Sequence, residues 1–65
     1  MIIEWMSANT VTLSVLPWRQ AIGDSVITAE CGLVIDDSTE NVTVIEGDRD
    51  RIRKILEGAL ASLDA

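Results

Sequence analysis

Four of the chain's five basic side chains lie in one short window, the stretch EGDRDRIRKIL at residues 46–56. They are Arg49, Arg51, Arg53 and Lys54. Guanidinium groups offer forked N–H donors to phosphate and carboxylate, so such a cluster can contact nucleic acid, a small anion or an acidic protein. The same side chains can instead border the apolar side of a helix and pair with carboxylates of the sheet, within one chain or across a dimer, which is the commoner fate of a surface charge run.

The distribution of charge favours the second interpretation of this window. The 65-residue chain has a formal net charge of −6. Residues 1–47 hold seven acidic side chains against Arg19 alone, whereas residues 48–65 hold four of each sign. A nucleic-acid-binding face usually has a positive total, so nucleic acid is the weaker expectation and an acidic protein partner the stronger one. Cations in the first turn of a helix oppose its dipole. If Arg49 and Arg53 lack carboxylate partners, an external ligand is indicated.

The residue types that support catalysis are mostly missing. The chain has no His and no Tyr, which excludes a Ser-His-Asp or Cys-His arrangement within one chain. The adjacent carboxylates Asp36 and Asp37 lie in DDSTEN, which is typical of a solvated turn and lacks the spacing of a calcium loop. The single Cys31 is expected to be a buried, inert thiol. We therefore expect no enzyme activity, no catalytic residue, no cofactor and no metal.

Trp5 and Trp18 are the only aromatic residues of the chain. Trp fills small cores, and it is also common at the energetic centres of protein interfaces. The sequence favours neither role over the other. The candidate partner-binding residues are Trp5, Trp18, Arg19, Arg49, Arg51, Arg53 and Lys54.

Three segments have the alternation that is typical of strands. Residues 10–17 place Val11, Leu13 and Val15 on one side and end at Pro17. Residues 25–36 form the longest predicted strand, with Ile27, Ala29, Cys31, Leu33 and Ile35 on one face. Gly32 falls inside this strand and indicates a bulge or a close backbone approach. Residues 41–46 form the third strand, which should pair with the second across the DDSTEN turn. A Gly23-Asp24 turn is expected between the first two strands.

The last segment predicts an amphipathic helix over residues 48–63, with Asp48 as its N-cap. Its apolar stripe consists of Ile52, Ile55, Leu56, Ala59, Leu60 and Leu63. The predicted fold is α+β: a three- or four-stranded antiparallel β-meander in residues 10–46, followed by one helix packed on one face of the sheet. Residues 1–65 form one small domain. Residues 1–8 are expected to form an edge strand or an arm that docks on a partner.

So short a chain, without a disulfide, usually needs self-association for stability, and we expect a homodimer. The dimer could pair sheet faces or edge strands. The apolar start is too short for a membrane span and lacks the layout of a signal peptide, which predicts a cytoplasmic protein that does not contact membranes. By elimination, the sequence favours a small, acidic protein-interaction module, such as an inhibitor, an antitoxin-like factor or an accessory subunit. A nucleic-acid-associated regulator that uses the basic start of the helix is the alternative.

Overall fold

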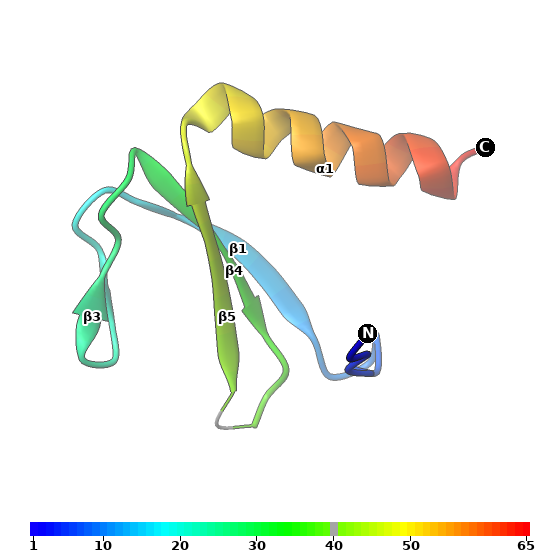
Figure 1. Ribbon diagram of the computed structural model, residues 1–65, viewed down its shortest axis with the longest axis horizontal. Coiled ribbons are helices and arrows are strands. Elements are labelled where there is room, and N and C mark those ends of the chain that lie inside the picture. Colours follow the sequence, from blue (N-terminus) through cyan, green and yellow to red (C-terminus); the bar gives the residue numbers. More distant parts are fainter. Residues whose placement is uncertain (40) are drawn as a thin grey trace.

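The structure is a computed structural model that describes residues 1–39 and 41–65. Its elements are β1 (Thr12–Pro17), β2 (Ala21–Ile22), β3 (Ser25–Val26), β4 (Cys31–Asp36), β5 (Val42–Gly47) and α1 (Arg49–Leu63) (Figure 1). The strands β1, β4 and β5 form an antiparallel sheet in that order, and β2 pairs with β3 in a small hairpin inserted between β1 and β4. The predicted α+β meander with one C-terminal helix on the sheet is therefore confirmed.

The predicted long strand over residues 25–36 is wrong, because the chain forms β3 and β4 with a non-strand segment between them. Ile27 interrupts the strand by turning its side chain onto the sheet face opposite α1. There it packs on Gly32, where an added Cβ would lie 2.7 Å from the Cδ1 atom of Ile27. The close approach predicted at Gly32 is therefore made by the side chain of Ile27 and not by another backbone segment. The expectation that Ile27 shares a face with Cys31 and Leu33 is wrong for the same reason.

Backbone hydrogen bonds fix the position of the segment between β3 and β4. The N–H of Ile27 donates to the carbonyl of Gln20 at 3.0 Å, and the N–H of Arg19 donates to the carbonyl of Ile27 at 2.9 Å. Arg19 has a φ of 66°, in the left-handed region that non-glycine residues rarely adopt. At the tip of the inserted hairpin Gly23 has a φ of 54°, which confirms the predicted turn there.

The core has two small parts, one on each side of β4. On the helix side, Cys31 and Leu33 pack against Ile52, with Leu56 at the border. On the other side, Ile27 lies next to Gly32 and Val44, and Val34 of the same face is also buried. β4 is buried on both sides because it is the central strand, while β1 and β5 form the edges.

Two carboxylates cap the start of α1. Asp48 accepts a hydrogen bond from the N–H of Arg51 at 2.8 Å, which confirms it as the N-cap. Glu30, from the segment before β4, accepts the N–H of Arg49 at 2.5 Å. Negative charge at the N-terminus of a helix interacts favourably with the helix dipole. It therefore offsets the unfavourable interaction of the dipole with the neighbouring cations. Ile52 and Leu56 continue this contact with the sheet, and the C-terminal part of α1 extends beyond the strands (Figure 1).

Residues 1–11 lie outside every helix and strand of the structure. The chain turns just before β1, where the N–H of Thr10 donates to the carbonyl of Ser7 at 3.1 Å. Of the two expectations for residues 1–8, the structure thus has no edge strand there, and a docking arm stays a prediction.

Candidate functional site

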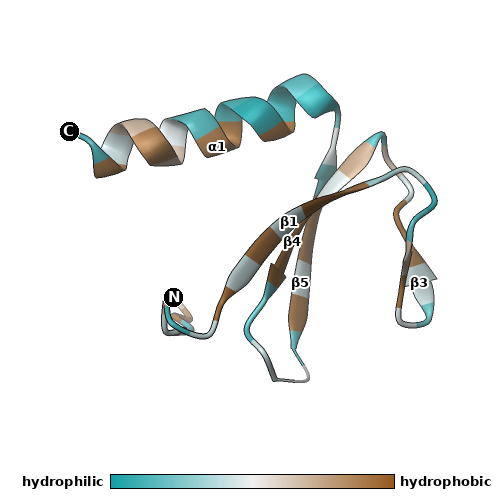
Figure 2. Cartoon of the chain, turned by 180° about the vertical axis from the view of Figure 1, so that it is seen from behind, coloured by the Kyte–Doolittle hydropathy of each residue, from teal (hydrophilic) through white to brown (hydrophobic). Residues whose placement is uncertain are grey.

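The apolar stripe of α1 is covered only near the start of the helix. Ile52 is buried and Leu56 is half-buried, whereas Leu60 and Leu63 are 59% and 78% exposed. Figure 2 shows this stripe along the side of α1 that is turned toward the strands. The apolar side of α1 is therefore buried in its N-terminal half and open to solvent in its C-terminal half.

The helix-side residues of β1 are also uncovered. α1 packs on β4 and β5. In β1, Leu13 and Val15 lie opposite Ile35 and Leu33 of β4, so they share the face toward the helix. Leu13 is nevertheless 57% exposed, and Val15 is also exposed. The sheet is therefore one strand wider than the part that the helix covers.

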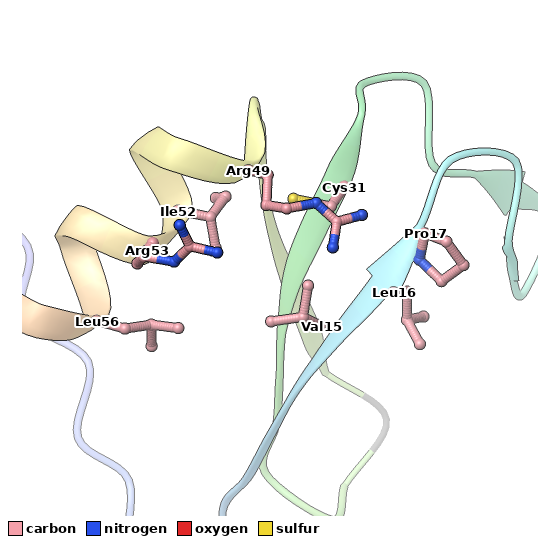
Figure 3. Close-up of a pocket in the computed structure, with 8 residues that line it drawn as sticks. All are labelled: Val15, Leu16, Pro17, Cys31, Arg49, Ile52, Arg53 and Leu56. Atoms are coloured by element: carbon pink, nitrogen blue, oxygen red, sulfur yellow. The ribbon is translucent and has the colours of Figure 1, made fainter.

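Between α1 and β1 lies a groove of about 320 Å³. It is lined by Val15, Leu16, Pro17, Cys31, Arg49, Ile52, Arg53 and Leu56. In Figure 3, Val15 and Leu56 point toward each other from the two walls, and Arg49 and Arg53 extend along the opening. The groove thus combines an apolar floor with two guanidinium groups at its rim, which suits a ligand that has both apolar surface and a negative charge.

The rim arginines do not pair with sheet carboxylates. Arg53 lies 3.6 Å from Asp50, one turn earlier in the same helix, and this is the ion pair found among residues 1–39 and 41–65. The sheet-side carboxylate that reaches the helix start, Glu30, accepts from the backbone of Arg49 and leaves its guanidinium without an ionic partner in that part of the chain. Within the described part of one chain, the expected pairing of the arginines with sheet carboxylates is therefore absent. Pairing with the sheet carboxylates of a second copy stays a prediction.

The structure separates the other predicted partner-binding residues. Arg19 stacks its guanidinium on the ring of Trp18, 4.4 Å from the ring centre, in the loop between β1 and β2. Trp18 is 57% exposed and Trp5 is 88% exposed, so neither Trp fills the core. Arg51 and Lys54 are exposed on α1 and do not line the groove. Of the seven predicted residues, the structure thus brings together Trp18 with Arg19 in this loop, and Arg49 with Arg53 at the groove.

Sequence reasoning missed the apolar walls of the groove. Val15, Leu56 and Cys31 are predicted as core residues, and their types alone do not distinguish a closed core from an open one. The alternation in β1 marks the correct face. That face stays exposed because of the direction in which α1 crosses the sheet, and no sequence pattern predicts this direction.

A second hollow, of about 530 Å³, lies on the sheet face away from α1, between β5 and the inserted hairpin. Its wall includes Glu46, whose carboxylate accepts from the N–H of Thr28 at 2.7 Å and from the Thr28 hydroxyl at 2.8 Å. These hydrogen bonds, the backbone one first, lower the pKa of Glu46 below its ordinary value. Glu46 thus holds the hairpin segment against β5, which is a structural role.

The adjacent carboxylates Asp36 and Asp37 shape the turn that follows β4. Asp36 accepts the N–H of Ser38 at 2.9 Å, and Asp37 accepts the N–H of Thr39 at 2.9 Å as well as its hydroxyl. The hydroxyl bond is the main cause that lowers the pKa of Asp37. Both carboxylates satisfy local donors in the manner of Asx turns, as the turn composition predicts. Within the part of the chain that the structure describes, no three His, Cys, Asp or Glu side chains gather as metal ligands would.

Over the described residues, α1 is too short and too polar to cross a bilayer, and no other helix is present. Comparisons with protein families, with curated proteins and with solved structures give no match for this chain.

Proposed function

We propose that this chain is a non-enzymatic protein-interaction module that acts as a homodimer, with the helix side of the sheet as its interface. In this role it acts by binding another protein, as an inhibitor, an antitoxin-like factor or an accessory subunit does. The observation that carries the proposal is the amount of apolar surface left open around α1 and β1.

The solvent-accessible surface area of the chain is large enough to support the proposal of a protein–protein interface. Its solvent-accessible surface is 5403 Å² for a mass of 7.1 kDa. A compact monomer of that mass exposes about 4100 Å². The excess, 5403 Å² minus about 4100 Å², is about 1300 Å². A stable protein–protein interface removes about 800 Å² from each partner, so the excess is large enough to supply one.

The shape of the chain agrees with this argument. The radius of gyration is 12.8 Å. A compact domain of 65 residues has a radius of gyration of about 11 Å. The added extent comes from the overhanging half of α1 and from the N-terminal residues (Figure 1). Both carry exposed apolar side chains, among them Leu60, Leu63, Ile2 and Trp5. So many exposed large apolar side chains on a small chain are typical of a protein with an interaction site.

The chemistry of the surface favours a protein over nucleic acid. The two rim arginines border apolar side chains. Asp48 and Asp50 flank them, which dilutes the positive potential that a phosphate backbone requires. The buried thiol of Cys31 suits the reducing cytoplasm, which we propose as the location.

Light scattering and sedimentation equilibrium test the proposal. We expect a mass of twice 7.1 kDa at micromolar concentration and a melting temperature that rises with protein concentration. A species of 7.1 kDa at millimolar concentration, with a melting temperature independent of concentration, would contradict the homodimer. Electrophoretic shift of labelled DNA and RNA at low salt tests the nucleic-acid alternative, for which we expect no shift.

A further inference from the structure

We infer that the groove between α1 and β1 receives the N-terminal arm, residues 1–6, of a second copy of this chain. The inference rests on the proposed homodimer and adds the segment and the site through which the two copies hold each other. The exchange is reciprocal, because each copy has one arm and one groove, and a two-fold axis then makes the two contacts identical.

The arm has the composition that the groove requires. Residues 1–6 read MIIEWM, five apolar side chains and the carboxylate of Glu4. These apolar side chains are exposed, with Ile2 at 91% and Trp5 at 88%. Docking such a segment in an apolar groove is favourable, because it removes apolar surface from water.

The groove has the complementary chemistry. Val15, Ile52 and Leu56 supply apolar walls, and Arg49 and Arg53 supply positive charge at the opening. The arm carries the carboxylate of Glu4 among its exposed apolar side chains. Placed at the rim, it would give the guanidinium of Arg49 the ionic partner that it lacks among the described residues. Charge complementarity of this kind fixes the orientation of two bound surfaces.

The geometry allows the arm to reach a neighbouring copy. Residues 1–11 precede β1 without forming a helix or strand. The arm itself, residues 1–6, lies before the turn at residues 7–10 and spans at most about 22 Å when extended. The groove is lined by the C-terminal half of β1, whereas the arm leaves from its N-terminal end (Figure 1). The arm of one copy can therefore extend away from its own groove and lie in that of another.

The first experiment removes residues 1–6 and measures the mass by sedimentation equilibrium. These residues form no helix or strand, and the exposure of their apolar side chains means that their loss should leave the fold intact, which circular dichroism checks. We expect the shortened chain to be a folded monomer while the full chain is a dimer. A shortened chain that still dimerises would overturn the arm exchange and leave the proposed homodimer standing. A full chain that is monomeric would overturn both.

The second experiment swaps charges between copies. The variant Glu4→Arg and the double variant Arg49→Glu with Arg53→Glu each place like charges at both contacts, and we expect each to weaken the homodimer at least about tenfold. In an equimolar mixture of the two, both contacts join opposite charges, so native mass spectrometry with one isotope-labelled partner should find the heterodimer restored. The control Asp24→Arg, in the hairpin turn away from the groove, should leave the dimer unchanged. A mixture that stays monomeric, or homodimers unaffected by either variant, would overturn the inference.

A third measurement separates exchange from docking of the arm in its own groove. Hydrogen exchange of residues 2–6 is followed across the monomer–dimer transition. Protection that appears only in the dimer supports exchange between copies. Protection already present in the dilute monomer means that the arm fills its own groove, which overturns the inference.

Discussion

The carboxylate of Glu46 accepts two hydrogen bonds from Thr28, one from the backbone N–H at 2.7 Å and one from the hydroxyl at 2.8 Å. Glu46 lies near the end of the edge strand β5, and Thr28 follows the inserted hairpin. This contact joins residues 18 positions apart and holds the segment between β3 and β4 on the sheet face away from α1. It therefore fixes to β5 the segment that interrupts the long strand predicted over residues 25–36.

The first prediction concerns acid stability. Hydrogen bonds from Thr28 lower the pKa of Glu46 below its ordinary value of 4.5, so its contribution to stability is complete above pH 4.5 and is lost as the pH falls through the folded-state pKa. Chemical unfolding at several pH values should show the wild type losing stability below about pH 4.5. The variant Glu46→Gln should be less stable at pH 7, and the difference should shrink toward pH 3. A difference that stays constant with pH would exclude this role for the carboxylate.

The second prediction concerns the contact between Gly32 and Ile27. A Cβ at position 32 would lie 2.7 Å from Cδ1 of Ile27 and 3.1 Å from Cγ1 of Val44. Gly32→Ala should therefore lower the free energy of unfolding by about 1–3 kcal/mol through overpacking. Because Ile27→Val removes the clashing methyl group, the cost of Gly32→Ala should be smaller in that background. Additive effects in this double-mutant cycle, measured by urea unfolding, would contradict the contact.

The third prediction concerns the cap of α1. Asp48→Ala removes the acceptor for the N–H of Arg51 and should cost about 1 kcal/mol of stability, measured by thermal or urea unfolding. Asp48→Asn retains an acceptor and serves as the control, with a smaller expected loss. Equal losses in both variants would assign the effect to charge and not to the hydrogen bond.

The fourth prediction separates the folded core from the proposed interface along one helix stripe. Ile52→Ala should cost about 2–5 kcal/mol because Ile52 is buried against Cys31 and Leu33. Leu60→Gln should change the stability of the monomer by no more than about 0.5 kcal/mol, since Leu60 is exposed. If the overhanging half of α1 belongs to the dimer interface, the same variant should weaken self-association, measured by sedimentation. A Leu60→Gln chain that unfolds as readily as Ile52→Ala would place Leu60 in the core.

The elements that depend on a local pattern of residues can be predicted from the amino-acid sequence alone. The 3.6-residue stripe and the Asp48 cap predict α1, and residues 49–63 form it because cap and stripe act within one segment. The Gly23-Asp24 turn and the part of the DDSTEN turn over residues 36–39 are equally predictable, because Asp and Gly act through hydrogen bonds and backbone freedom near their own positions, whereas residue 40 lies outside the described residues. The alternation in residues 10–17 also places Leu13 and Val15 on the correct face.

Packing between distant parts of the chain sets where a strand pattern is interrupted and which apolar surfaces stay exposed. Ile27 fits the alternation of one long strand, yet it crosses to the opposite face because Gly32 leaves room for it there. Arg49 and Arg53 are visible in the sequence as a charge cluster, but their place at the rim of an apolar groove depends on how α1 leaves β5. These features arise from contacts between residues far apart in the chain. A sequence pattern reports which side of an element is apolar, and the packing of the whole chain decides whether that side is covered.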